Sequence, residues 1–282
     1  MPVSYSYLSK TMKSSKNICV YGIMLLLTFA TAASSWADEN KSSPWKKFSV
    51  DFGFFYPIFN TEVRLDSKTL GRGTDIDGED DLNLKTELSL FRAEAQWRFF
   101  PKHRLEFTYY DISRDASVFL GRTLQFGDRT FTIGTTIRSD TNIQIFKIAY
   151  TWSFLQTQDY ELGISLGADL MDIETSISAP IIGDESEALI APLPVLGLRA
   201  AYAFSPNFVL NTSADFFYLE YEEFKGRLLD VNFNLEYYFL EYLSLSIGYN
   251  FFDVEVTYES DRRDLDFGYL FHGPKAAVKI YF

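Results

Sequence analysis

Hydrophobic and polar residues alternate along most of the chain after residue 46. In the segment 227–239, Leu229, Val231 and Phe233 alternate with Asp230 and Asn232, so one face of an extended strand is apolar and the other polar. Ten such segments occur, each long enough to cross a bilayer as a tilted strand. They lie at 48–59, 86–99, 104–116, 141–154, 160–173, 193–204, 208–221, 227–239, 243–256 and 267–282. This pattern predicts an all-β protein.

The same alternation is found in soluble β-sandwiches and in membrane β-barrels, but two further features favour a barrel. Connections alternate between short and long, and the short ones lie at 101–103, 156–159, 205–207 and 240–242. Aromatic residues such as Phe99, Trp152 and Tyr242 gather near these turns, where an interfacial girdle is expected. We therefore expect a closed, up-and-down, antiparallel transmembrane β-barrel of about ten strands, with eight or twelve as alternatives.

The long connector from Val118 to Ile137 carries several apolar side chains around Gly127. It is expected to form a hairpin that projects beyond the membrane or folds over the barrel mouth. If both of its arms entered the wall, the barrel would have twelve strands.

The first 37 residues have the pattern of a secretory signal peptide. Lys10, Lys13 and Lys16 precede an apolar run over 18–33, and the segment ends with small residues at Ser35 and Ala37. We predict that residues 1–37 are cleaved and that 38–282 form the barrel domain. The alternative is a permanent membrane anchor, although the run is shorter than a spanning helix requires.

The chain ends in an alternating strand with Val278, Ile280 and Phe282 on one face. This terminus resembles the assembly signal of outer-membrane barrel proteins, which implies the barrel-assembly machinery as a partner.

The wider sequence resembles an uncharacterised family of small bacterial outer-membrane β-barrel proteins, within the group that includes OmpW-type and OmpA-type barrels. The matching stretches are 75–82, 97–105, 162–173 and 192–199. The resemblance implies a Gram-negative outer-membrane location, with lipid and lipopolysaccharide around the barrel. It supplies no activity, and ten segments depart from the eight strands of OmpW-type and OmpA-type barrels.

Composition excludes several other classes of protein. The net charge of −12 makes the chain a poor ligand for nucleic acid, and its single cysteine excludes a disulfide scaffold. A mean hydropathy of −0.07 agrees with the balanced alternation of a barrel. We find no motif for a cofactor.

The polar face of the strands defines an expected lumen. Its charges are of both signs, so they are expected to pair across a narrow interior. The expected set is Asp51, Arg92, Glu94, Arg98, Glu106, Lys147, Glu161, Asp169, Arg199, Asp215, Asp230 and Glu236. This set is compatible with a structural polar core or with a narrow, porin-like path for small solutes.

Evidence for catalysis or metal binding is weak. Asp75, Asp77 and Asp80 are candidate ligands for a divalent cation, but a solvated acidic loop is the simpler interpretation. The chain has two histidines, His103 in a short turn and His272 in the last strand. We expect a non-enzymatic protein with a structural or permeation role. The alternatives are a lipid-modifying or peptide-modifying enzyme that uses His272, and an adhesin that acts through loops 60–85 and 117–140.

Overall fold

The computed structural model describes residues 45–180, 182–261 and 263–282. The predicted signal peptide, including Cys19, lies outside the described residues. Within the described ranges, no helix is long and apolar enough to cross a membrane.

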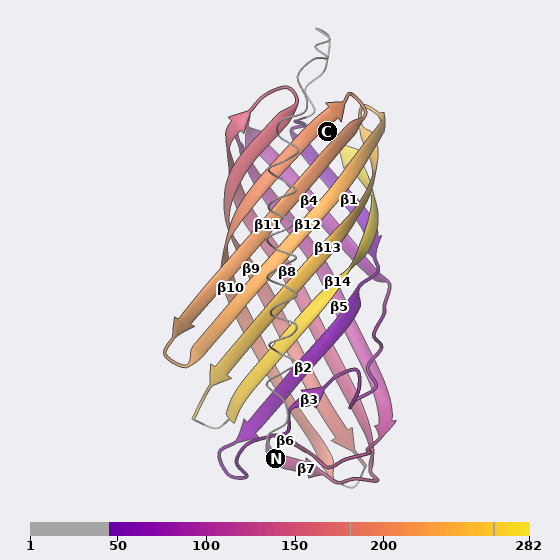
Figure 1. Cartoon of the computed structure of the whole chain (residues 1–282), viewed down its shortest axis with the longest axis vertical. Helices are drawn as coiled ribbons and strands as arrows, with labels where there is room; N and C mark the ends of the chain where they lie inside the picture. The colour runs from indigo at the N-terminus through magenta and orange to yellow at the C-terminus, as the bar shows by residue number, and fades with distance from the viewer. Residues whose placement is uncertain (1–44, 181, 262) are drawn as a thin grey trace. The chain divides into compact units, whose positions relative to one another are not determined.

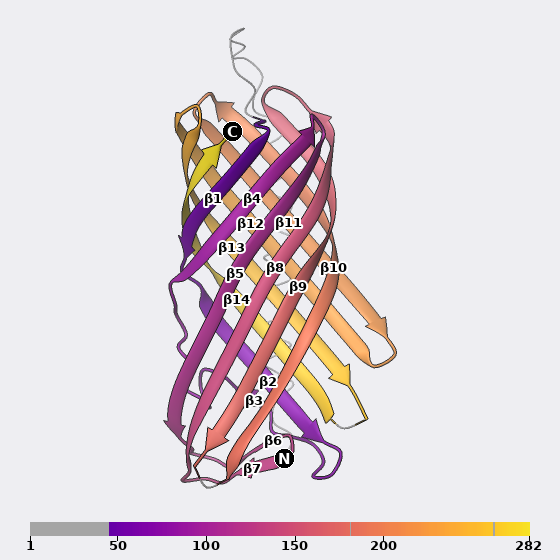
Figure 2. The same cartoon turned by 180° about the vertical axis from the view of Figure 1, so that it is seen from behind.

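The described residues form fourteen β-strands and most of them belong to one sheet (Figures 1 and 2). The strands are β1 (Phe48–Phe55), β2 (Ile58–Ser67), β3 (Ile76–Asp77), β4 (Leu90–Phe100), β5 (His103–Phe119), β6 (Leu124–Phe126), β7 (Arg129–Phe131), β8 (Thr136–Gln156), β9 (Tyr160–Ala179), β10 (Gly183–Ser205), β11 (Phe208–Tyr221), β12 (Phe224–Leu240), β13 (Leu243–Glu259) and β14 (Arg263–Tyr281).

The sheet closes on itself because β1 pairs with β4 on one side and with β14 on the other. The strands β1 and β2 share one register on β14: Phe55 lies opposite Lys275, and Ile58 lies opposite His272. They therefore act as a single wall strand that is interrupted at Tyr56. With β4, β5 and β8 to β14, this gives ten strands in the ring, each overlapping one predicted segment. The predicted antiparallel barrel of about ten strands is confirmed.

Several strands are much longer than the roughly ten residues that cross a bilayer, and β8 has 21 residues. On β8 the outward side chains near the short turns are apolar, as in Phe146, but Gln144 and those beyond it are polar. The inward side chains change in the opposite sense, from Lys147 to Ile145 and Ile143.

The barrel wall therefore extends past the outer side of the membrane, and the apolar face there points inward. The prediction that the apolar face meets lipid and the polar face lines the lumen holds only for the half near the short, periplasmic turns. In the extension it is wrong, because the outer wall meets water and the interior has to be filled with apolar groups.

The connector between β5 and β8 forms the hairpin β6–β7, which folds over the extracellular mouth and does not join the wall. Leu124, Phe126 and Phe131 are buried in the core of the extension. The N–H of Gly127 donates to the backbone oxygen of Leu65 at 2.9 Å, which ties the hairpin to β2. The twelve-strand alternative is therefore wrong.

Closure leads to a simple prediction for detergent. Every wall strand is paired on both sides for much of its length, so few backbone N–H and C=O groups are free and the sheet is hard to open in detergent. The folded protein should resist SDS without heating and migrate faster before boiling than after it. Gel electrophoresis of a sample verified as folded by circular dichroism checks this, and identical migration would argue against a closed barrel.

Candidate functional site

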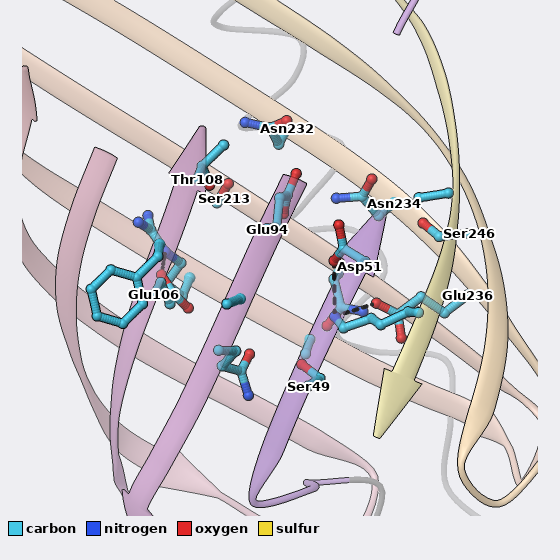
Figure 3. Close-up of a pocket in the computed structure, with 18 of the residues that line it drawn as sticks. Ser49, Asp51, Glu94, Glu106, Thr108, Ser213, Asn232, Asn234, Glu236 and Ser246 are labelled. Carbon is cyan, nitrogen blue, oxygen red and sulfur yellow. Dashed lines mark hydrogen bonds and ion pairs between the residues drawn. The ribbon is translucent and has the colours of Figure 1, made fainter. Parts of the chain in front are cut away.

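The membrane-spanning half of the lumen contains a polar cavity of about 180 Å³ (Figure 3). All twelve charged residues expected in the lumen line this cavity. The structure adds Lys46, just before β1, and three bases on the wall strands that the sequence analysis missed: Arg104, Lys275 and Lys279. Arg104 lies two residues before Glu106, which faces inward, so the two share a face of β5. Lys275 and Lys279 are an odd number of residues from Val278, which faces outward, so both lysines face inward. The alternation was therefore a sufficient signal for all three.

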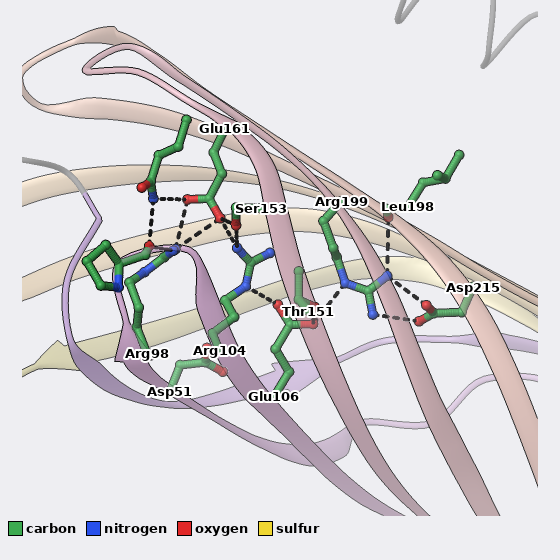
Figure 4. A network of polar contacts seen from close by, with 12 residues as sticks. Asp51, Arg98, Arg104, Glu106, Thr151, Ser153, Glu161, Leu198, Arg199 and Asp215 are labelled. Carbon is green, nitrogen blue, oxygen red and sulfur yellow. Dashed lines mark hydrogen bonds and ion pairs between the residues drawn. The ribbon is translucent and has the colours of Figure 1, made fainter.

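Near the periplasmic end, Glu161 of β9 accepts hydrogen bonds from several side chains (Figure 4). The guanidinium of Arg98 lies 2.8 Å from Glu161 Oε2, and Arg104 and Ser153 contact Oε1. Glu161 is 2% exposed, so its charge is compensated by protein groups rather than by bulk water.

The network continues across the lumen through Glu106 and Arg199 (Figure 4). Glu106 is bound by Arg104 Nε at 2.6 Å and by Arg199 Nε at 2.8 Å. Arg199 also makes two hydrogen bonds to Asp215, at 2.6 and 3.2 Å. The strands β5, β8, β9, β10 and β11 are thereby joined through their inward side chains.

A second cluster surrounds Lys147 of β8. Its ammonium lies 3.0 Å from Asp169 and 3.9 Å from Asp215, and it also contacts Asp230. Asn250 donates to Asp230 at 2.6 Å, and Arg92 donates to Asn250 at 2.8 Å.

A third cluster lies where β1, β12 and β14 meet. Lys279 is 3.0 Å from Glu236 and 3.9 Å from Asp51, which makes Lys279 the cation between two carboxylates. Lys275 donates to Asn232 at 2.9 Å and lies 3.5 Å from Glu94.

The cavity lining is electrically balanced, with eight acidic and eight basic side chains. Opposite charges in a low-dielectric interior stabilise the fold only when they pair closely and satisfy their hydrogen bonds. The three clusters pair their charges closely, and they connect every wall strand that contributes a charge. Their hydrogen bonding is incomplete only at Arg92 Nε, Arg98 Nε and Asp169 Oδ2, which are buried without a hydrogen-bond partner among the described residues. The geometry is that of a structural ionic core around a small polar cavity.

Beyond this cavity the barrel interior holds a layer of buried apolar side chains that we call the apolar collar. Every wall strand contributes one inward apolar side chain to it, just past that strand's inward polar residues. The collar consists of Phe55, Leu90, Tyr110, Ile145, Met171, Val195, Phe217, Leu228, Phe252 and Phe271, all of which are buried.

Aromatic rings hold the collar together. The ring of Phe271 lies 4.6 Å from that of Phe252, 5.7 Å from that of Phe55 and 6.0 Å from that of Tyr110. Cations of the ionic core lie against the same layer: Arg92 is 5.1 Å from the Tyr110 ring. The collar was not predicted, but the change of parity along strands such as β8 was visible in the sequence.

The two histidines lie apart from the lumen. On the outer surface of β14, His272 Nδ1 is 2.6 Å from the hydroxyl of Tyr249, and both rings face lipid at the outer border of the apolar band. His103 begins β5 at a periplasmic turn, and its Nδ1 is 2.6 Å from the hydroxyl of Tyr150. The hydrogen-bond partner of each ring is thus a tyrosine hydroxyl.

The carboxylates of the acidic loop have partners within the protein. Asp75 binds Arg64 at 2.8 Å and Arg72 at 3.2 Å. Partial burial raises the pKa of Asp75, but the two guanidinium groups outweigh it and hold the pKa below its usual value. Asp77 accepts the N–H groups of Glu79 and Asp80, while partial burial and these two acids raise its pKa.

Among the described residues, no three acidic, histidine or cysteine side chains are arranged to hold a metal ion. Asp75 and Asp77 are instead in contact with arginines and backbone N–H groups of the same part of the chain.

The C-terminal residues lie on the outer surface of the wall. Val278 and Phe282 are 42% and 73% exposed, and the Phe282 N–H donates to the oxygen of Phe48 at 2.9 Å. The terminal strand is therefore paired to β1 up to its last residue.

The chain matches no protein-family model and no curated protein. Among solved structures, it is similar to the outer membrane protease OmpT from Escherichia coli, with 13% identity and a TM-score of 0.55 over 86% of this chain and 99% of that one. The transport unit of the autotransporter AIDA-I from Escherichia coli gives 9% identity and a TM-score of 0.40, over 88% and 93% of the two chains. Ail, the attachment invasion locus protein of Yersinia pestis, gives 10% and 0.33, over 81% and 99%.

The similarity to OmpT concerns the fold alone, which is that of a bacterial outer-membrane β-barrel. The predicted location in the outer membrane is confirmed by this fold. The narrower relation to OmpW-type or OmpA-type barrels stays a prediction.

Proposed function

We propose that this chain is a non-enzymatic outer-membrane barrel with a structural role, whose lumen is closed to solutes. The observation that carries the proposal is the apolar collar, which receives a buried side chain from each wall strand. The sequence left a structural core and a permeation path open, and the collar favours the structural core.

A permeating ion would lose its hydration at the collar without gaining polar partners. An uncompensated charge in an apolar layer costs far more than thermal energy, so the layer acts as a barrier even if small gaps form. The hairpin β6–β7 and the buried residues Leu65, Leu82 and Leu84 thicken this barrier on the extracellular side.

Planar-bilayer conductance of the folded protein tests the proposal. We expect the native protein to be nearly silent. The Arg199→Ala variant should also stay silent, because it disturbs the ionic core but leaves the collar in place. The double variant Phe252→Ala/Phe271→Ala should conduct if its barrel folds. Steady native currents whose ion selectivity changes in Arg199→Ala would replace the closed-lumen proposal with a narrow pore.

An enzymatic role through His272 receives no support from the geometry, because the ring faces lipid beside Tyr249. We therefore expect His272→Ala to leave lipid A composition and external peptide cleavage unchanged when the variant replaces the native protein in cells. Mass spectrometry of lipid A and a fluorogenic peptide assay provide the measurements. A hydrolytic activity of the native protein that disappears in His272→Ala would establish the enzyme alternative.

The proposed partners follow from the outer surface. The apolar band around the periplasmic half suits membrane lipid, and the polar wall above it suits the lipopolysaccharide layer and water. Val278, Ile280 and Phe282 remain the proposed signal for the barrel-assembly machinery.

A further inference from the structure

The barrel wall is split in its extracellular part between β10 and β11. β10 pairs with β9 from Gly183 to Tyr202, but it pairs with β11 only from Leu196 to Ser205. Both views show the β11–β12 hairpin leaning away from β10 (Figures 1 and 2). We call the resulting gap the β10–β11 notch and define it by residues 184–195 of β10 and 217–221 of β11.

Two prolines explain where the pairing ends. The N–H of Ala203 donates to the oxygen of Asp159 at 2.6 Å, so odd-numbered residues of β10 direct their backbone groups toward β9. Even-numbered residues direct theirs toward β11, and among them Pro192 and Pro194 have no N–H to donate. The ladder to β9 is thus preserved, while the ladder to β11 stops at Leu196.

The opposite edge of the notch keeps its donors. The N–H of Tyr238 donates to the oxygen of Asn207 at 2.8 Å, which shows that odd-numbered residues next to and within β11 pair with β12. The backbone N–H and C=O groups of Tyr218 and Glu220 therefore point into the notch, where no strand of the described chain pairs with them. A free edge of this kind can accept an added strand.

The notch lies outside the hydrocarbon layer. Unpaired backbone groups are not tolerated facing lipid tails. Consistent with this, Tyr218 is opposite Arg227 of β12, whose guanidinium forms an outward ion pair with Glu255. Water and soluble partners can therefore reach the notch.

Side chains in the notch alternate in a way that selects its occupant. Leu219 and Tyr221 face the barrel interior, yet they are 41% and 64% exposed because no strand covers them. Glu220 lies between them and faces outward, where its carboxylate accepts the Tyr218 hydroxyl at 2.9 Å and lies 3.5 Å from the ammonium of Lys225. The ion pair with Lys225 is exposed on both sides, so a basic residue of an added strand can exchange with it. The adjoining turn adds two exposed acids, Glu222 and Glu223. An added strand would meet apolar groups on its inner face and acidic groups on its outer face.

We propose that the β10–β11 notch binds an extended segment of a partner protein in which basic residues alternate with apolar ones. The segment pairs with the backbone of Tyr218 and Glu220, places its apolar side chains against Leu219 and Tyr221, and places lysine or arginine near Glu220. This site is independent of whether the lumen conducts.

The test uses the folded protein in phosphatidylcholine nanodiscs and a fluorescent peptide of about nine residues that alternates valine and lysine. Fluorescence anisotropy should show binding of this peptide, and much weaker binding of a valine and glutamate peptide or of the lysine peptide with a central proline. Glu220→Pro removes an N–H that β12 does not use, so it should leave the hairpin folded and weaken binding by about tenfold or more.

Two matched variants separate edge pairing from charge. Glu220→Ala keeps the N–H, so it should weaken binding less than Glu220→Pro does. Glu220→Lys should shift the preference toward the glutamate peptide. Equal affinity in the native protein and both the Pro and Lys variants would overturn the proposal. It would also be overturned if the native protein bound no peptide, whether because it dimerised through a contact that Glu220→Pro abolishes or because lipopolysaccharide occupied the notch.

Discussion

Replacing Phe271 with alanine should lower the free energy of unfolding by about 3 to 5 kcal/mol, because it leaves a cavity in the centre of the collar. Phe271 is fully buried, and its ring contacts those of Phe55, Tyr110, Phe252 and other neighbours. Urea unfolding of the protein in phospholipid vesicles measures the loss.

Phe146→Ala is the matched control. Its ring faces lipid and is 41% exposed, so lipid chains can occupy the space that the ring leaves. Phe146→Ala should lower the free energy of unfolding only through the lost transfer of the ring from water, because no cavity forms. The decrease should therefore be smaller than for Phe271→Ala. If both variants lost the same amount, the collar would not be a close-packed layer.

The sequence predicted the wall of the barrel well, because wall strands obey one rule that is local to each strand. Alternation located all ten of them, and it assigned the inward direction to residues as far apart as Asp51 and Glu236. A register error of one residue would have placed these charges in lipid, so the membrane-spanning part allowed only one assignment.

The extracellular extension could not be predicted by the same rule. Its strands continue the alternation, but the apolar positions change parity where the outside changes from lipid to water, as between Phe146 and Ile145. An interpretation that assumes lipid on the outside loses the expected alternation at this point, and the segment predicted for β8 ended soon after it, at residue 141. For this reason the predicted segments ended early at the extracellular ends of β8, β9 and β10.

The pairing of the ionic core was also beyond the sequence. The alternation predicted that Arg98 and Glu161 both face the lumen. Whether they form an ion pair depends on strand tilt and register, which the sequence does not show. The notch depends in addition on Pro192 and Pro194, whose effect follows only from the side of β10 on which their missing N–H groups lie.

Glu161→Ala should cost about 3 to 5 kcal/mol of unfolding free energy, since it leaves two buried guanidinium groups close together without their shared acid. Arg98 would keep only its 2.8 Å hydrogen bond to the oxygen of Pro101, and Arg104 would keep Glu106 at 2.6 Å. These remaining contacts place the expected loss nearer the lower value. Urea unfolding in vesicles again provides the measurement.

The control for this variant is Glu255→Ala, which removes the acid of an ion pair on the outer wall. Glu255 and its partner Arg227 are 48% and 39% exposed, so the change should be within about 1 kcal/mol. A double variant Glu161→Ala/Arg98→Ala should recover part of the loss, because it removes one of the two uncompensated charges. If Glu161→Ala behaved like Glu255→Ala, water would be screening the periplasmic end of the lumen, and the ionic core would contribute little to holding the barrel together.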